Sequence, residues 1–395
     1  MNTTNHVTPL AAGALTFSPD GVLFVGDNKL AAIFAFETDR GAAPASLDPF
    51  LFESIDERIA EALGVTVKSL VMNGMAVHPV TREPYLSVGI RSGERLEPAV
   101  VSVSLAGEVH PFDLSSPRAT VHRLSDVPDQ DKTFTSRAGF FSVPPAAYYD
   151  EKARTPLRSM TIVDLKFHDG DVFVAGVSNQ EFSSTLRRVP YPFTGAASQT
   201  QVEIYHLAHG QYETRAPIRT MQFATIDGVD TLIAAYACSP LVTIPVSELK
   251  DGAKVTGRTV GDMGNGQPIS MVAYRDGEGD KVLVTNLSRG PMIVPLSTIH
   301  SVDGYTHENR PTQERMLDQS PHMPAGPVGK QVLFVGSSLR ADLFSDRFFV
   351  SLTRYADTGD LTLETLPVFP MPARLDKIWV EFDFPGVGGM HTQAA

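Results

Sequence analysis

Residues 15–28 read LTFSPDGVLFVGDN, and this stretch contains the pattern that decides the fold. An apolar strand enters an Asp-Gly turn, and a second apolar strand leaves the turn and ends in a short polar cluster. The pattern returns at residues 165–174 as LKFHDGDVFV, and two more copies turn at Asp227-Gly228 and Asp276-Gly277. Asp-Gly favours tight hairpin turns because glycine adopts a positive φ without a steric penalty. The sequence therefore predicts a series of β-hairpins.

The hairpin pattern recurs along most of the chain. Six segments carry it, centred on residues 14–36, 72–105, 161–190, 218–247, 268–296 and 331–366. A period of about 50–70 residues built on hairpins is typical of a β-propeller, in which each blade buries its faces against its neighbours. We therefore expect a single all-β domain over residues 1–395, a propeller of six or seven four-stranded blades. A strand at 378–384 is expected to close the ring by pairing with N-terminal strand material.

Two insertions interrupt the repeat. Ser54-Ile55-Asp56-Glu57 is a capping-box motif and Gly64 is a stop signal, so we expect a short helix at about residues 54–63. Residues 115–158 are rich in aromatic residues and proline. A loop of this length is typical of a lid, and we expect it to fold over the channel mouth. Its aromatic content equally supports a homodimer contact, and padding on the outside of the ring is the third alternative.

Composition excludes several classes of partner. The net charge of −12 on 395 residues argues against binding to nucleic acid or to an anionic membrane, both of which require basic surface. A single cysteine excludes an intramolecular disulfide and any multi-cysteine metal site. The apolar runs are too short to span a membrane, and the N-terminus lacks the pattern of a signal peptide. We expect a soluble cytoplasmic protein, or a periplasmic or secreted one if a leader has been removed.

Propeller geometry predicts which residues meet at one mouth of the channel. The starts of first strands and the ends of second strands share one face, and the Asp-Gly turns mark the opposite face. His78 and His168 lie beside those turns and are not expected to be ligands, and Cys238 is expected to be a small buried hydrophobe. The oxygen-bearing residues expected at the mouth are Asp27, Asn28, Asn73, Asp164, Asn179, Glu181 and Asn286. Such oxygens suit Ca²⁺, although Asn and Asp are also ordinary turn residues.

Four arginines fall in comparable loops, at Arg91, Arg219, Arg289 and Arg354. Together they predict a positive mouth on an acidic protein. A guanidinium group binds carboxylate or phosphate through two parallel hydrogen bonds, so the partner expected here is a small anionic molecule. Ordinary surface ion pairs are the alternative explanation for these arginines.

Two pieces of the chain carry a family resemblance. Residues 73–79, NGMAVHP, and residues 17–28 resemble repeats of the gluconolactonase-like (senescence-marker-protein-like) and NHL-type propellers. The lactonase family holds a Ca²⁺ or similar ion at the channel mouth through Glu, Asn and Asp from different blades. The resemblance implies that Asn73 is a metal ligand, and Asp164 and Asn286 fit by their place in the repeat. The early Glu ligand of that family is not found, and the 115–158 insertion is foreign to it.

These observations predict a metal-dependent enzyme that hydrolyses a lactone or ester of a small anionic substrate at the channel mouth. A divalent ion, Ca²⁺, would polarise the carbonyl. The expected ligands are Asn73, Asp164, Asn179 and Asn286, with Glu181 or Asp27 as general base and Arg91, Arg219, Arg289, Arg354 and Asn28 as substrate-binding residues. Two alternatives stay open. The first is a non-catalytic propeller that binds a ligand or protein partner through the same mouth, and the second is a lyase or isomerase on this scaffold.

Overall fold

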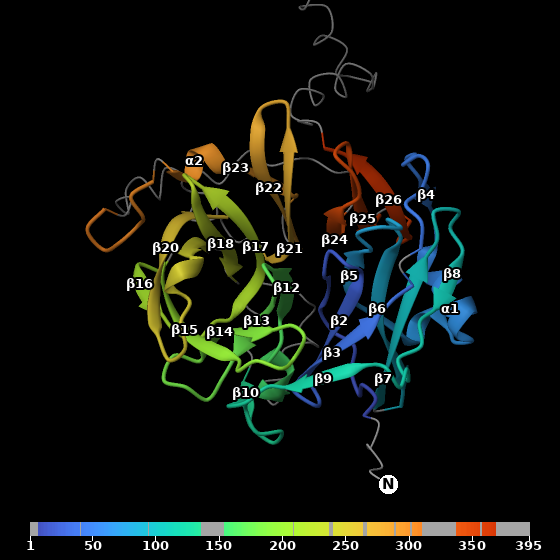
Figure 1. The fold of residues 1–395 in the computed structure, drawn as a ribbon, viewed down its shortest axis with the longest axis horizontal. Coiled ribbons are helices and arrows are strands. Elements are labelled where there is room, and N and C mark those ends of the chain that lie inside the picture. Colours follow the sequence, from blue (N-terminus) through green and yellow to red (C-terminus); the bar gives the residue numbers. More distant parts are fainter. Residues whose placement is uncertain are drawn as a thin grey trace, which may run out of the picture.

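The structure is a computed structural model that describes residues 7–39, 41–93, 95–135, 154–207, 209–236, 240–263, 267–287, 290–300, 302–309, 337–355 and 358–368. Over these ranges the fold is all-β, with antiparallel hairpins arranged around a centre as in a propeller (Figure 1). The expectation of an all-β, propeller-like fold is confirmed. No helix within the described ranges has the length and apolar character needed to cross a membrane.

Three sheets have four strands each, and every neighbouring pair in them is antiparallel. The first contains β1 (Leu15–Phe17), β2 (Val22–Asp27), β3 (Ala32–Glu37) and β9 (Thr120–Arg123). The second contains β5 (Leu70–Val77), β6 (Pro84–Ser92), β7 (Arg95–Val103) and β8 (Val109–Pro111). The third contains β24 (Ser337–Leu343), β25 (Phe348–Arg354), β26 (Leu361–Pro367) and β4 (Leu51–Phe52).

A nine-stranded sheet joins two further hairpin groups. One group contains β12 (Asp164–His168), β13 (Asp171–Val177), β14 (Ser184–Pro190), β15 (Ser198–His206) and β16 (Gln211–Glu213). The other contains β17 (Ile218–Ile226), β18 (Val229–Tyr236), β19 (Pro240–Pro245) and β20 (Lys254–Asp262), and β15 pairs with β20 in parallel. A three-stranded sheet contains β21 (Pro268–Asp276), β22 (Gly279–Asn286) and β23 (Met292–Pro295). A separate hairpin contains β10 (Thr133–Thr135) and β11 (Arg154–Pro156).

The Asp-Gly turns form hairpins as the sequence predicted. Asp169 and Gly170 have φ values of 45° and 83° between β12 and β13, and Asp227 and Gly228 have values of 52° and 77° between β17 and β18. Positive φ at both central residues defines the type I′ turn, whose twist matches that of the two strands. The fourth turn differs, because its positive φ lies at Gly279 rather than at Gly277.

The first strands of the hairpin groups contact one another in a closed ring, in the order β1, β12, β17, β21, β24, β5 and back to β1. This order departs from the chain order, since the β5 sheet lies between the first and last groups. Two strands that pair outside their own hairpin group place the β5 sheet between the first and last groups. β9 follows the β5 sheet in sequence and pairs with β3, while β4 precedes that sheet and pairs with β26. The predicted closing strand at 378–384 lies outside the described residues, and β4 provides a pairing of N-terminal with C-terminal strands.

The core lies between neighbouring hairpin groups of the ring. Phe173 and Leu186 of the β12 group pack with Leu232 and Val242 of the β17 group, all at most 2% exposed. These layers bury the faces that a single hairpin would leave in water.

The helix predicted near residues 54–63 is present as α1 (Ile55–Leu63), and Ile55 and Ile59 pack on the β5 and β24 sheets. Gly64 ends it with φ 67°, as predicted. The capping-box prediction at Ser54 is wrong. Ser54 is left-handed, with φ 48°, and its side chain makes no capping bond. Its backbone carbonyl instead accepts the N–H groups of Glu57 and Arg58.

The described residues also form the short helices α2 (Leu296–His300), η1 (Val67–Ser69), η4 (Leu157–Met160) and η5 (Val246–Glu248). Part of the predicted 115–158 insertion belongs to the propeller, because residues 120–123 form β9. The β10–β11 hairpin and η4 follow it. The lid and dimer predictions fall mainly on residues 136–153, which lie outside the described part of the chain.

Candidate functional site

A cavity of about 1380 Å³ occupies the centre of the ring. It is lined by residues of β1, β5, β12, β17, β21 and β24, the strands that contact one another around the axis. Within the described residues no further strand pairs with the inner edge of any first strand, so the N–H and C=O groups of that edge need other partners. The side chains that satisfy them therefore determine the chemistry of the cavity wall.

Polar side chains on the first strands bond to the backbone of the next strand in the ring. Asp164 Oδ2 on β12 accepts the N–H of Met221 on β17 at 2.8 Å. Asp342 Oδ2 on β24 accepts the N–H of Val77 on β5 at 2.8 Å. Thr16 accepts from Phe167, and Ser270 accepts from Ala341. These side chains connect neighbouring groups of the ring, so part of the polar lining of the cavity has a structural role.

One-residue bulges interrupt four of the first strands near their starts. The unpaired residues are Asn73 in β5, Arg219 in β17, Ile269 in β21 and Leu339 in β24. A bulge bends its strand and redirects side chains, and bulges are enriched beside functional sites. Asn73 and Arg219 both line the cavity.

Asp164 and two arginines form the charged centre of the lining. Asp164 Oδ1 accepts the N–H of Leu165 at 2.9 Å, in addition to the bond from Met221. Burial raises the pKa of Asp164, although the charge of Lys166 opposes this. Burial lowers the pKa values of Arg219 and Arg340, and the negative charge of Asp164 opposes part of this lowering. This cluster therefore contains the carboxylate of Asp164 and the guanidinium groups of Arg219 and Arg340.

The two guanidinium groups differ in how they are held. Arg340 donates from Nε to the carbonyl of Asn73 at 3.0 Å and from Nη1 to the carbonyl of Leu339 at 2.9 Å. Burial lowers its pKa to about 10, so it stays protonated at neutral pH. Arg219 is partly buried, and its guanidinium has no hydrogen bond or ion pair with any residue in the described part of the chain. A partly buried cation without a partner is costly, and it marks a place where an anion can bind.

The cavity has a surplus of positive charge. Among the described residues, six with cationic side chains line it: Lys29, Arg82, Arg158, Lys166, Arg219 and Arg340. Three described carboxylates line it: Glu97, Asp164 and Asp342. Among the described residues, none of the six cations forms an ion pair with a carboxylate. A concave surface of one sign focuses the field, so this cavity attracts anions although the whole chain carries a charge of −12.

Four of the residues predicted from sequence line the cavity: Asn28, Asn73, Asp164 and Arg219. The last three lie at or near the starts of first strands. Asn28 follows a second strand, and its amide is occupied by both backbone groups of Ile162, at 2.8 Å and 2.9 Å. Its contribution to the cavity is therefore to hold the residues that lead into Asp164.

The other described residues predicted for the mouth do not line the cavity. Asp27 is fully buried and accepts the N–H groups of Leu10, Ala11 and Leu30. Asn286 is 2% exposed and bonds to Val284 in its own strand. These two side chains end second strands, which lie one strand away from the axis. The assumption that such ends meet the starts of first strands at the cavity therefore does not hold for them.

Four more predicted residues are exposed on the surface and do not line the cavity. Glu181 forms an exposed ion pair with Lys254 at 2.5 Å, and Asn179 bonds to Val127 and Lys132. Arg91 is exposed at the end of β6, and Arg354 bonds to the carbonyl of Gly359. Arg289 lies outside the described residues, as does Cys238.

The histidines discounted from the sequence have structural contacts. His78 is fully buried, with Nε2 2.9 Å from the Thr38 hydroxyl, and its Nδ1 accepts the N–H groups of Val80 and Thr81. His168 pairs with Asp230 at 2.8 Å.

Sequence reasoning missed Arg340 and Lys166. Both belong to pairs of charged residues two apart in a first strand, Asp164 with Lys166 and Arg340 with Asp342. Residues two apart in a strand face the same side, so charge at both positions of a first strand indicates an inner face in contact with water. This alternation was the signal in the sequence that could have identified them.

The described residues around Asp164 do not fit a Ca²⁺ site. Calcium takes six to eight oxygens, and only Asn73 and Asp164 of the four predicted ligands line the cavity. Both oxygens of Asp164 already accept backbone N–H groups. The charges of Lys166, Arg219 and Arg340 also oppose a cation at this place.

No protein-family model matches the chain, and no curated protein matches it. Solved structures do match. The soluble aldose sugar dehydrogenase of Escherichia coli in its apo form is 13% identical, with a TM-score of 0.34, over 92% of this chain and 98% of that one. A glucose dehydrogenase is 12% identical, with a TM-score of 0.34, over 91% and 97%. The U3-55K structure is 9% identical, with a TM-score of 0.36, over 90% and 96%. At TM-scores this low, the similarity says nothing about activity.

Proposed function

We propose that the central cavity binds a small molecule with one or more carboxylate or phosphate groups, and that Arg219 and Arg340 anchor it. The observation that carries the proposal is the guanidinium of Arg219, which has no hydrogen-bond or ion-pair partner among the described residues, in a cavity that these residues line with six cations and three carboxylates. An anion bound there supplies the partner that the described part of the chain does not provide. A guanidinium fork gives such an anion two parallel hydrogen bonds.

The same reasoning favours a ligand over an accidental surplus of charge. Several cations inside one cavity repel each other, and their interaction strengthens as water is excluded. Arg340 is held in place by two backbone carbonyls, so little side-chain entropy is lost when an anion binds to it. We infer further that the ring around this cavity has six blades, with the parallel pairing of β15 and β20 joining two of them.

The reaction, if one occurs here, stays a prediction. Hydrolysis of a lactone or ester with bound Ca²⁺ requires ligands that the described cavity offers only through Asn73 and Asp164. A lyase or isomerase would need a proton carrier, and Asp164, whose pKa burial raises, is the candidate in this cavity. Binding without chemistry requires only the cations. The anion proposed here fits all three alternatives in their small-molecule form; a protein partner at the same mouth is the other form of the non-catalytic alternative.

The binding proposal is tested with inorganic phosphate and succinate as probes, by isothermal titration and by thermal shift. We expect wild-type protein to bind at least one of them, with affinity that falls as salt is raised. Arg219→Gln should weaken binding by tenfold or more. Arg91→Gln is the matched control, because Arg91 was predicted for the mouth yet is exposed outside the cavity. Equal loss in both variants, or no binding by wild type, would reject the proposal.

The calcium prediction has its own test. Protein purified without chelator is analysed for bound metal, and its thermal stability is measured with and without Ca²⁺ for wild type and Asp164→Asn. We expect no calcium-dependent shift in either. A shift in wild type that Asp164→Asn removes would support the metal-dependent hydrolase and would overturn the anion assignment of this cluster.

A further inference from the structure

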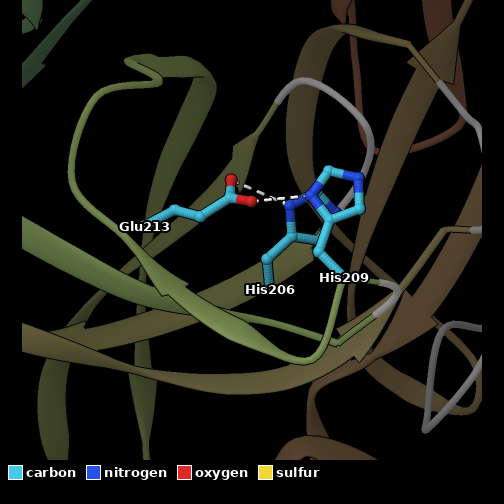
Figure 2. Close-up of side chains that lie close together, drawn as sticks. All are labelled: His206, His209 and Glu213. Carbon is cyan, nitrogen blue, oxygen red and sulfur yellow. Dashed lines mark hydrogen bonds and ion pairs between the residues drawn. The ribbon is translucent and has the colours of Figure 1, made fainter.

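A second cluster of functional side chains lies on the β15–β16 hairpin, away from the central cavity. His206 ends β15, Glu213 ends β16, and His209 lies in the turn between them. In the antiparallel register His206 pairs with Gln211, and Glu213 pairs with Ile204. His206 and Glu213 therefore project from the same face of the hairpin, and Figure 2 shows the carboxylate facing both imidazole rings.

The contacts within this cluster are short. Nδ1 of His206 lies 2.9 Å from one carboxylate oxygen of Glu213, and Nδ1 of His209 lies 2.6 Å from the other. The two rings have their centroids 3.9 Å apart. Burial alone would raise the pKa of Glu213, but the hydrogen bonds from both histidines and the charge of His206 lower it to about 2. The carboxylate is therefore ionised at neutral pH.

We propose that His206, His209 and Glu213 form a binding site for a divalent transition-metal ion of the Zn²⁺ class. One ligand atom from each side chain lies within 4.8 Å of the other two. A tetrahedral zinc ion with bonds of about 2.0–2.2 Å holds its ligand atoms about 3.3 Å apart, so a small side-chain rotation closes the site. Two imidazoles and a carboxylate suit zinc and its neighbours better than Ca²⁺ or Mg²⁺. Three protein ligands leave a fourth position for water.

The hairpin allows this rotation and lets an ion enter. The His209 side chain is 44% exposed, whereas that of His206 is 2% exposed and that of Glu213 is 21% exposed. His209 lies in a turn that Gly210 closes with φ 65°, so its ring is the movable ligand on a fixed pair. All three ligands lie within eight residues of sequence, so binding closes only a short loop.

The opposite face of the hairpin is occupied by a separate set of contacts. Tyr205 and Tyr212 pair across the strands, and both rings contact the ring of His307. These contacts fix the hairpin from behind and hold His206 and Glu213 in register. An ion on the front face would bind to a preformed pair rather than organise a loose segment.

Metal binding must also account for protons. In the present arrangement each Nδ1 faces a carboxylate oxygen, so a proton lies between each histidine and Glu213. An ion that binds Nδ1 takes the place of that proton. In a neutral ring the proton moves to Nε2, whereas a doubly protonated ring must release one proton to solvent. Affinity therefore falls as the pH is lowered through the range in which histidine becomes protonated.

The test uses the full chain without a histidine tag. Zn²⁺ binding is measured by titration calorimetry, and Co²⁺ is added as a spectroscopic probe whose visible absorption reports tetrahedral geometry. We expect one ion per chain, and at least a tenfold loss of affinity in His209→Ala. Glu213→Gln should also weaken binding, because its neutral amide is a poorer ligand. His300→Ala is the matched control, since His300 is exposed and pairs with a single carboxylate, Asp227.

Two results would overturn the site. One is a wild-type chain that binds neither ion, which would leave the cluster a hydrogen-bonded group only. The other is Zn²⁺ affinity that His209→Ala and Glu213→Gln leave unchanged while the protein stays folded. Neither result bears on the central cavity, whose test uses anions and different variants.

Discussion

Gly176 on β13 provides a sharp test of how the segment leading into Asp164 packs. A Cβ added at this position would lie 1.8 Å from the carbonyl oxygen of Thr161 and 2.9 Å from that of Met160. Both contacts are with backbone, so no side-chain rotation relieves them. In Gly176→Ala the segment at residues 160–163 must move by more than an ångström.

The cost follows from what this movement breaks. The N–H of Val163 donates to the carbonyl of Ala175 at 2.7 Å, and Ile162 exchanges two hydrogen bonds with the amide of Asn28. Overpacking costs about 1–3 kcal/mol, and each lost hydrogen bond adds about 0.5–1.5 kcal/mol. We expect Gly176→Ala to lower the free energy of unfolding by about 3–5 kcal/mol.

The assay is chemical denaturation, with the unfolding midpoint and slope compared between variants. Gly277→Ala is the control, because a Cβ there meets nothing within 4 Å, and its stability should stay within about 0.5 kcal/mol of wild type. A Gly176→Ala variant as stable as this control would refute the packing of residues 160–163 on β13. The position assigned to Asp164 in the cavity would fall with it.

Three further predictions concern charged groups. Burial raises the pKa of Asp164, so the native state holds the carboxyl proton more tightly than the unfolded chain does, and the stability that this proton contributes declines as pH rises from the ordinary pKa of 3.8 through the raised one. Asp164→Asn should remove that decline from melting temperatures measured between about pH 3 and 7. The pKa of Glu213 is lowered to about 2, so the ionised carboxylate stabilises the fold fully above the ordinary pKa of 4.5, and this stabilisation is lost as pH falls toward 2. The melting temperature of Glu213→Gln should therefore not show this decrease in acid. Lys281 is 5% exposed and pairs at 2.6 Å with Asp276, which is 6% exposed; Lys281→Met should cost about 3–5 kcal/mol in chemical denaturation, because it leaves that carboxylate without its ion-pair partner. Arg275→Gln, in the exposed pair with Asp280, should leave the unfolding midpoint close to that of wild type.

The local sequence was sufficient to predict the hairpin turns and the end of helix α1. Asp169-Gly170 and Asp227-Gly228 specify their hairpins because the backbone conformation at a two-residue turn depends on those two residues. Gly64 ends α1 for the same kind of reason. The repeat of such hairpins was enough to predict an all-β, propeller-like arrangement. Ser54 shows the limit of motif reading, since its own left-handed conformation prevented the capping bond.

The ring order was decided only by tertiary structure. β9 pairs with β3 across residues that contain the whole β5 sheet, and β4 pairs with β26 from the other end of the chain. The unpaired N–H and C=O groups of an edge strand can pair with any strand that lies beside them. The local sequence does not predict which strand the fold brings to that edge.

For the residues of the central cavity, too, the sequence predicted one part and the tertiary structure decided the other. The sequence indicated an arginine-lined mouth, and Arg219, Asn73 and Asp164 do line the cavity because they lie on first strands, the innermost strands of the ring. It placed Asp27, Glu181 and Arg91 beside them, since position in a repeat does not say whether a side chain points toward the axis, onto a neighbouring segment or into solvent. The His206, His209 and Glu213 cluster could not be anticipated either, because its convergence depends on the register of one hairpin. Residue type determined the chemistry available to this protein, and the three-dimensional direction of each side chain decided where that chemistry gathers.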